Sequence, residues 1–311
     1  MSNLLSPAMP DGPDEAPSVR PIIEPYPARS VELVPGFAVW RALPTRGRRT
    51  VGSWCFLDRF RSPNQTLDVA PHPHIGLQTV TWLNRGAILH QDSLGNEQRI
   101  EPGQLNLMTS GAGIAHAEVA VDPGAGLEGL QLWIALPEDA RRTAAAFEHH
   151  AELPVARFGR IEGRVLIGEL DRRRSPATIF SDAVGAELTA TESGEARIPL
   201  DPRFEHAVLL LEGEARLGGE TIPASTLLYL GEGRERIDLA ASQGARIFLF
   251  GGLPFPEPLL MWWNFVARTP EEIARARDDW EQGRFDPVRG YAGDPIPAPP
   301  LALRLAKPRS D

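Results

Sequence analysis

Short hydrophobic runs separated by turn residues recur along most of the chain. Typical runs are LQTVTWL at 77–83, LEGLQLWI at 127–134 and AVLLL at 207–211. β-Branched, aromatic and other apolar residues dominate them, and glycine, proline or asparagine breaks the chain between them, as at 84–87 and 102–103. Runs of this length with closely spaced turn signals are typical of β-sandwiches and barrels. The pattern therefore predicts an all-β fold.

The alternation of short hydrophobic runs and turns stops between residues 137 and 150. The segment EDARRTAAAFEHH contains good helix formers, so we expect a short helix and a domain linker there. Further candidate strands follow at 165–167, 177–180, 186–190, 207–211, 226–230 and 246–250. We therefore predict an extended N-terminal arm at 1–30, one β-barrel domain at 31–150 and a second at 151–311.

A single helix is expected near the C-terminus. Thr269 and Pro270 provide an N-cap and a proline at the first helical position, and Glu272 follows three residues after the cap. Gly283 would end the helix, which places it at about 270–282. The remaining tail is rich in proline and is expected to be irregular.

Composition narrows the class of protein. The chain has 311 residues, of which 42% are hydrophobic and 23% charged, as in soluble globular proteins. A formal charge of −9 argues against direct binding to nucleic acid, which requires basic surfaces. The single cysteine, Cys55, excludes an intrachain disulfide, and neither a signal peptide nor a membrane span is evident. We expect a cytoplasmic protein, and a monomer because two barrels in one chain can pack together.

Two pairs of polar residues suggest a metal site in the first half. His72 and His74 are two residues apart, and so are His116 and Glu118. Residues two apart on a strand share a face, so neighbouring strands would bring three imidazoles and one carboxylate together. This set suits a divalent transition metal: iron, nickel, copper, manganese, cobalt or zinc. Alternatively, Glu118 could be a partner that orients His116.

Other histidines are harder to assign. His90 could be a fifth ligand or a proton donor in the pocket, although a hydrogen-bonded neighbour of the site is the preferred interpretation. Met108 and Trp133 are most simply core residues, and pocket lining is the second possibility. In the second half, the positions two residues before and after His206 hold Phe204 and Val208, whose side chains cannot bind a metal. The second barrel is therefore expected to hold no metal.

The stretch PHPHIGLQTVTWLNRGAILHQDSLGNEQRIEPGQLNLMTSGAGIAHAE, at 71–118, resembles the signature of the pirins, a branch of the cupin superfamily. FLDRF before it, EGLQLWIALP after it, and LYLGEG and MWWNFVARTPEEI in the second half also fit. The resemblance implies two tandem cupin barrels, which are double-stranded β-helices, with a C-terminal helix. It also implies one metal, usually iron as Fe(II), in the first barrel, held by His72, His74, His116 and Glu118.

The sequence departs from the pirin pattern near the predicted pocket. Ile75 and Gln78 stand where many pirins have arginine and glutamate. Ordinary cupins place a ligand glutamate at the position of Gln78, so Glu118 would be the only anionic ligand here. We expect Gln78, His90, Met108 and Trp133 to line a substrate pocket.

The resemblance supports two classes of function. Some pirins resemble quercetin 2,3-dioxygenases, in which a flavonol and dioxygen would react at the metal with Glu118 as general base. Other pirins are similar to metal- and redox-dependent regulators that bind a transcription factor or a metabolic enzyme. A third possibility is a former enzyme that serves as a scaffold.

Overall fold

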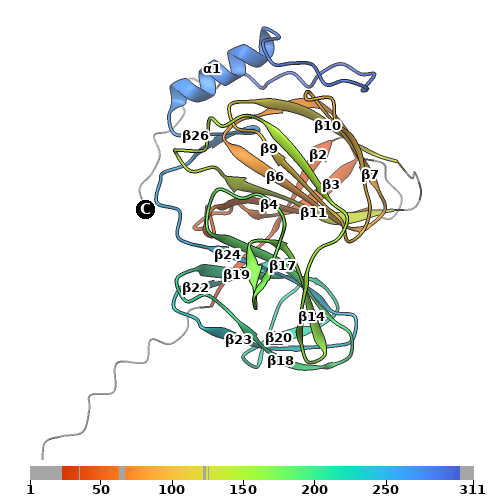
Figure 1. Cartoon of the computed structure of the whole chain (residues 1–311), viewed down its shortest axis with the longest axis vertical. Helices are drawn as coiled ribbons and strands as arrows, with labels where there is room; N and C mark the ends of the chain where they lie inside the picture. Colours follow the sequence, from red (N-terminus) through yellow and green to blue (C-terminus); the bar gives the residue numbers. More distant parts are fainter. Residues whose placement is uncertain (1–22, 35, 63–66, 122–123, 125, 302–311) are drawn as a thin grey trace, which may run out of the picture.

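The strands predicted from the sequence form two β-domains stacked along the long axis of the molecule (Figure 1). The computed structural model describes residues 23–34, 36–62, 67–121, 124 and 126–301. Most of the predicted N-terminal arm and the end of the tail lie outside these residues. Each domain contains a seven-stranded and a four-stranded sheet, and the named strand pairs within them are antiparallel. The all-β prediction is confirmed.

The N-terminal domain contains the residues that are predicted to bind a metal. Its large sheet has the order β12 (Ala146–His150), β9 (Leu105–Thr109), β6 (Leu77–Arg85), β11 (Leu127–Ala135), β4 (Trp54–Ser62), β3 (Phe37–Leu43) and β2 (Arg29–Val34). Its small sheet has the order β5 (Asp68–His74), β10 (Ile114–Ala120), β7 (Ile88–Asp92) and β8 (Glu97–Ile100).

The C-terminal domain repeats this plan. Its large sheet has the order β1 (Glu24–Pro27), β22 (Thr226–Gly231), β19 (Glu205–Glu212), β24 (Arg246–Gly252), β17 (Ala183–Ala190), β14 (Ile161–Ile167) and β13 (Val155–Phe158). Its small sheet has the order β18 (Gly194–Pro199), β23 (Arg236–Ala241), β20 (Ala215–Leu217) and β21 (Glu220–Thr221). Two hairpins complete the strands: β15 (Glu169–Leu170) with β16 (Arg173–Arg174), and β25 (Leu260–Trp262) with β26 (Phe265–Ala267).

The two large sheets pack back to back and share one hydrophobic core. Side chains alternate between the faces of a strand, so every second residue of β6 turns toward the other domain. Val80 and Trp82 do so and are buried in this shared core. Trp54 of β4 makes edge contacts with Phe248 and Phe250 of β24, at ring-centroid distances of 6.2 and 6.0 Å. Such interlocked aromatic packing joins the domains firmly.

Three sequence predictions are wrong in detail. Residues 146–150 form β12 rather than part of a helix, because their backbone pairs with β9 at the edge of the large sheet. Pairing within the fold thus overrides helix propensity there. Residues 177–180 are not a strand, and residues 24–27, predicted as arm, form β1 by pairing with β22.

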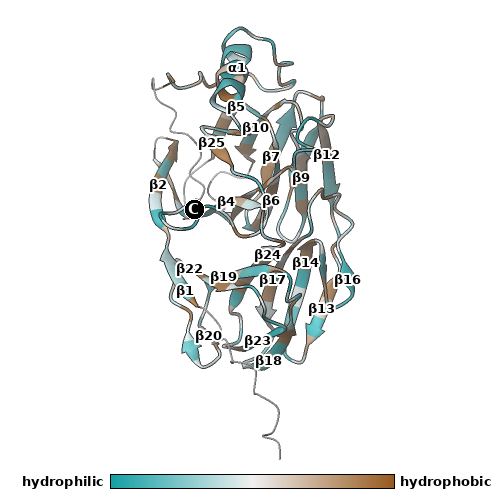
Figure 2. Ribbon diagram, turned by 90° about the vertical axis from the view of Figure 1, so that its left-hand side faces the viewer, coloured by the Kyte–Doolittle hydropathy of each residue, from teal (hydrophilic) through white to brown (hydrophobic). Residues whose placement is uncertain are grey.

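The predicted helix is confirmed as α1 (Pro270–Glu281). Thr269 caps it, and its hydroxyl accepts a hydrogen bond from the backbone nitrogen of Glu272. The helix lies at the far end of the N-terminal domain, against β26, although it follows the second domain in sequence (Figure 2). The side chain of Ile273, on the inward face of the helix, is fully buried. Within the described part of the chain, no helix has the length and apolar character needed to cross a membrane.

Candidate metal centre

The two histidine-containing pairs lie on adjacent strands of the small sheet. His72 and His74 are on β5, and His116 and Glu118 are on β10. These strands are antiparallel neighbours, and His116 lies directly opposite His72 in the register. A register shift between His116 and Glu118 moves Glu118 opposite Val69 on one side, while it pairs with His90 of β7 on the other.

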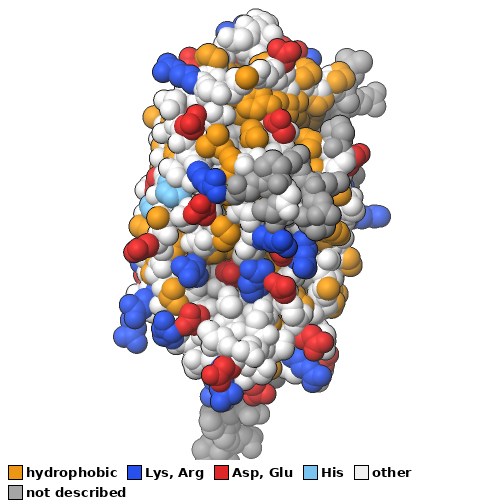
Figure 3. Space-filling model, turned by 90° about the vertical axis from the view of Figure 1, so that its right-hand side faces the viewer, with side chains coloured by type: hydrophobic (Ala, Val, Ile, Leu, Met, Phe, Trp, Pro, Cys, Tyr) orange, Lys and Arg blue, Asp and Glu red, His pale blue; other side chains and the backbone are white. Residues whose placement is uncertain are grey.

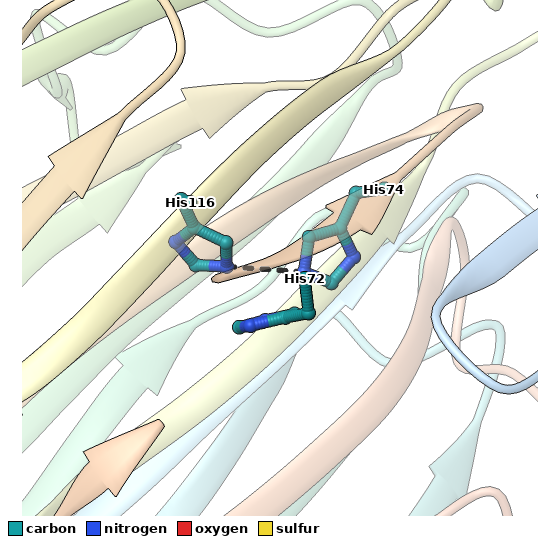
Figure 4. A group of neighbouring side chains, drawn as sticks. All are labelled: His72, His74 and His116. Carbon is teal, nitrogen blue, oxygen red and sulfur yellow. Dashed lines mark hydrogen bonds between the residues drawn. The ribbon is translucent and has the colours of Figure 1, made fainter. Parts of the chain in front are cut away.

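The three imidazoles converge inside the N-terminal domain (Figure 4). One nitrogen of each ring lies within 4.8 Å of the others, and Nε2 of His74 and Nε2 of His116 are 3.1 Å apart. Two nitrogens bound to one ion at about 2.1 Å and at right angles would be about 3 Å apart. The spacing therefore fits ligands that share a metal ion.

Backbone carbonyls fix the orientation of two of these rings. Nδ1 of His72 lies 2.9 Å from the carbonyl oxygen of Ala70, and Nδ1 of His74 lies 3.1 Å from that of Asn264. A carbonyl oxygen only accepts, so each Nδ1 carries the proton and each Nε2 keeps its lone pair for a ligand. Asn264 belongs to the turn between β25 and β26, where Trp263 adopts a left-handed backbone with φ of +51°.

A histidine and an aspartate orient the third ring. Asp92 accepts hydrogen bonds from the backbone nitrogens of Leu94 and Asn96, and its Oδ2 lies 3.1 Å from Nε2 of His90. The Nε2–H group of a neutral His90 therefore donates to Asp92, and its Nδ1 can accept from Nδ1 of His116, 3.4 Å away. This arrangement leaves Nε2 of His116 free to face the other two imidazoles.

Burial keeps the ligand imidazoles neutral. It lowers the pKa of His72 to about 4, and it lowers the pKa values of His74 and His116 well below their usual range, with the neighbouring His72 adding to the effect. A metal binds the neutral imidazole, so a site built this way needs no deprotonation before binding at neutral pH. The donor set and its protonation fit a divalent transition metal.

Glu118 stands beside this group rather than at its centre. One of its carboxylate oxygens lies within 4.8 Å of the nitrogens of His116 and His90, which forms a second cluster overlapping the first at His116. Burial raises the pKa of Glu118, and the hydroxyl of Thr81, 3.1 Å from Oε1, opposes that rise by donating a hydrogen bond. The carboxylate is thus placed to reach either an ion or a ligand beside it.

A cavity of about 440 Å³ opens from the metal site. Its wall includes the three imidazoles and Glu118, together with Phe56 and Trp133, whose rings stack on each other with centroids 4.0 Å apart. Other contributions come from strands β2, β3, β4, β5, β7, β10 and β11 and from residues near the C-terminus. The volume is within the range of small-molecule sites, about 300–1,000 Å³.

Comparison with known proteins identifies the family. The family model described as Pirin matches residues 36–134, and that described as Pirin C-terminal cupin domain matches residues 185–286. The chain belongs to the pirin family. The resemblance noted in the sequence is therefore confirmed, and so is the prediction of two tandem cupin domains.

Several relatives are similar over most of their length. A Pseudomonas aeruginosa protein named "Putative quercetin 2,3-dioxygenase PA1205" is 44% identical over 89% of this chain and 90% of its own. The crystal structure of a quercetin 2,3-dioxygenase from Acinetobacter baumannii is 42% identical, with a TM-score of 0.86 over 92% of this chain and 98% of that one. A bacterial pirin from Escherichia coli, solved in complex with nickel(II), shares the fold at 17% identity, with a TM-score of 0.61 over 75% of this chain and all of that one.

The pirin cavity contains only one of the four predicted pocket residues, Trp133. Gln78 points away from the cavity, because it lies on the same face of β6 as Val80. Its side chain donates hydrogen bonds to Thr109 and to the carbonyl of Thr178. His90 lies behind His116, stacked on Phe147. Met108 is buried on β9, a strand that contributes nothing to the cavity wall. Those three residues therefore do not line this cavity.

The sequence analysis did not predict other residues that line the cavity or contact its histidines. Arg41, Asp58 and Gln131 line the cavity. A charged residue within the apolar run WCFLDRF was a usable signal for Asp58, since Phe56, Asp58 and Phe60 share one face of β4. Asn264 had no such signal, because it is 190 residues from the histidine that it contacts.

The surface of this pirin carries mixed charges on the face shown in Figure 3. Arg side chains alternate with Asp and Glu over the lower half, which is the C-terminal domain, and hydrophobic side chains gather toward the upper part. Among the described residues on this face, no broad field of positive charge is visible.

Proposed function

We propose that this pirin is a metal-dependent dioxygenase that opens the ring of flavonols such as quercetin. One observation carries the proposal: the three converging imidazoles and Glu118 face a cavity that is also lined by the aromatic side chains of Phe56 and Trp133. The relatives named as quercetin 2,3-dioxygenases support it. We propose Fe(II) as the resident ion, although the donor set also accepts nickel, copper, manganese, cobalt or zinc.

The ion would be held by His72, His74 and His116, with Glu118 as its anionic ligand. When bound, it supplies a Lewis acid that lowers the pKa of a flavonol hydroxyl and a site at which dioxygen reacts. The overall reaction adds both oxygen atoms to the flavonol, opens its central ring and releases one carbon as carbon monoxide.

Glu118 serves as general base in this proposal. Burial raises its pKa, which makes the carboxylate a better proton acceptor than an exposed glutamate. The hydroxyl of Thr81 donates to Oε1 and holds the carboxylate in place, so the other oxygen is available to take the proton of the substrate hydroxyl. The proton stays on Glu118 until the product phenol or carboxylate receives it.

The cavity positions the substrate. Phe56 and Trp133 stack on each other in the cavity wall, and Trp133 also contacts His74 with ring centroids 5.3 Å apart. A flat ring in the cavity can therefore pack against aromatic side chains beside the imidazoles, which limits its freedom of orientation.

The direct test is turnover of quercetin in air by Fe(II)-loaded protein, measured as loss of flavonol absorbance and release of carbon monoxide. Elemental analysis of the protein as purified identifies the ion that it carries. Metal-free protein is expected to be inactive. His72→Ala is expected to lose the metal, whereas Glu118→Gln should keep most of it if the three imidazoles suffice and lose turnover by about 100-fold or more.

Flavonol loss that continues in both variants would refute the proposal, as would metal-loaded protein that consumes no flavonol. Glu138→Gln is a suitable control because Glu138 lies on the surface, where it bonds Arg141. It makes the same chemical change outside the cavity.

A further inference from the structure

A row of polar side chains crosses the inner face of the large N-terminal sheet. In the register, Arg41 of β3 lies opposite Asp58 of β4, Asp58 lies opposite Gln131 of β11, and Gln131 lies opposite Thr81 of β6. Arg41, Asp58 and Gln131 line the cavity, and Thr81 bonds Glu118. Strands in a sheet are about 4.8 Å apart, so the row extends roughly 14 Å from Thr81 to Arg41.

The adjoining row is aromatic. Phe56 of β4 lies opposite Trp133 of β11, and both line the cavity two residues from Asp58 and Gln131 along their strands. The guanidinium of Arg41 lies over the ring of Phe56, 4.5 Å from its centroid. A ligand that packs against the aromatic row therefore lies beside the polar row.

The polar row retains hydrogen-bonding capacity that the protein does not use. Arg41 donates from Nε and Nη2 to the two oxygens of Asp58, at 2.8 and 2.7 Å, while its Nη1 makes no hydrogen bond within the described ranges. Each carboxylate oxygen of Asp58 can still accept a further proton donor. Two neighbouring hydroxyls of a ligand can thus be bound, one accepting from Arg41 and the other donating to Asp58.

Gln131 offers a similar pair of groups. Its side-chain amide and Glu118 both contact the hydroxyl of Thr81, at 3.0 and 3.1 Å. The amide atom that contacts Thr81 is Oε1, so the amide nitrogen of Gln131 makes no hydrogen bond among the described residues. Its two N–H groups and the second lone pair of Oε1 are free for a ligand.

The charge of the row selects against acids. The guanidinium of Arg41 is paired through two hydrogen bonds with the buried carboxylate of Asp58, and the row carries no net charge. A ligand carboxylate would compete with Asp58 and would add a second buried anion near Glu118. A neutral hydroxyl uses the free positions of the row without that cost.

We propose that Arg41, Asp58 and Gln131 form a recognition site for hydroxyl groups on the ring of the substrate farthest from the metal. The site makes this pirin selective for flat, polyhydroxylated aromatics over analogues that lack those hydroxyls or carry a carboxylate there. This inference rests on the proposed function for the orientation of the ligand, since the reacting end occupies the metal site.

Binding without turnover tests the inference separately from the proposed reaction. The probes are two flavonols that differ only in the pendant ring, which carries two hydroxyls in one and none in the other. Their Kd values are measured without oxygen on the metal-loaded full chain by quenching of tryptophan fluorescence. Wild type is expected to bind the hydroxylated probe at least about tenfold more tightly, because unpaired buried polar groups disfavour the other.

Two variants remove parts of the recognition site without leaving a buried charge unpaired. Gln131→Leu deletes the amide, and Arg41→Lys keeps the positive charge beside Asp58 but removes the planar fork. Each is expected to reduce the ratio of the two Kd values by about threefold to tenfold, with little change for the unhydroxylated probe. Gln243→Leu, on the exposed surface of the C-terminal domain, is the matched control and should keep the wild-type ratio.

The outcomes separate the two proposals. A ratio that stays at the wild-type value in both variants overturns the recognition site, even if quercetin is consumed. A ratio that falls in both variants supports the recognition site, even if the metal-loaded protein never consumes flavonol, in which case the dioxygenase proposal alone fails. Absence of binding to either probe overturns both.

Discussion

The small sheets of the two domains have the same strand order but opposite contents. In the N-terminal domain, His72 of β5 lies opposite His116 of β10. On the matching pair of strands in the C-terminal domain, Ile198 of β18 lies opposite Ile237 of β23. One scaffold therefore presents a pair of imidazoles in one domain and a pair of aliphatic side chains in the other.

The interiors behind these pairs differ in the same way. The C-terminal interior is filled by a continuous cluster of aliphatic residues that includes Ile198 and Ile237, both almost fully buried. The N-terminal interior contains the cavity and the buried imidazoles instead. The comparison teaches that the fold does not need the metal site, because an apolar core supports the same sheets. The N-terminal domain gives up part of that core to hold buried polar groups.

The largest effect is expected when the N-terminal site is converted to its C-terminal counterpart. The double variant His72→Ile/His116→Ile removes two of three imidazole ligands, so bound metal should fall to background and turnover by more than about 100-fold. The fold should persist, because the second domain packs isoleucines against each other on the matching strands. Metal analysis and circular dichroism measure the two effects.

Metal retained by that double variant would contradict the assignment of the site. His149→Ile is a suitable comparison for loss of a histidine elsewhere, since His149 is half-buried, bonds Asn106 and lies outside the cavity wall.

In the C-terminal domain, a core substitution is expected to lower stability without changing metal binding. Ile237→Ala leaves a void in a filled core, so it should lower the free energy of unfolding by about 2–5 kcal/mol. Metal content at 25 °C should not change. Urea unfolding and metal analysis check both statements. A loss of metal without loss of stability would contradict the assignment of metal binding to the N-terminal domain alone.

The orientation of His116 provides a smaller effect within the N-terminal site. Asp92→Asn weakens the acceptor that fixes the proton of His90, and His90 in turn fixes His116. Metal affinity is expected to fall by about 10- to 100-fold, as for other partners of metal ligands. Competition with a chelator measures it. Asp139→Asn is the surface control. An unchanged metal affinity in Asp92→Asn would show that Asp92 does not orient His116 through His90.

The sequence predicted the convergence of the three imidazoles better than their surroundings. Two residues two apart on a strand share a face by local geometry alone, so His72 and His74 could be paired without knowledge of the fold. The same alternation places Gln78 with Val80 and Trp82, but proximity in sequence to the histidines outweighed it in our prediction. Contacts such as that of Asn264 with His74 depend on the path of the whole chain and leave no local pattern.

Acid should destabilise the metal-free protein through the buried imidazoles. Burial lowers the pKa of His72 from 6.5 to about 4, so between these values the unfolded chain binds a proton that the folded chain excludes. Stability is therefore complete above pH 6.5 and falls as pH drops toward 4, by roughly 1.4 kcal/mol per pH unit for this residue.

The variant His72→Ile should show a shallower fall over the same range, measured by urea unfolding at several pH values. Some slope should remain, because His206 in the C-terminal domain also has a pKa lowered to about 4 by burial. Equal slopes in wild type and variant would mean that His72 is not held neutral in the folded protein.

The smallest effect is expected at Gln78, which lies between the domains rather than in either interior. Its side chain donates to Thr109 and to the carbonyl of Thr178, while its own carbonyl oxygen has no partner among the described residues. Gln78→Leu removes two donors and one unsatisfied acceptor, so these terms largely offset each other and the net cost should be about 1 kcal/mol or less. Metal content and the Kd of a flavonol should match those of wild type, because the side chain faces away from the cavity. A flavonol Kd that rises in this variant would show that the junction between the domains communicates with the N-terminal interior.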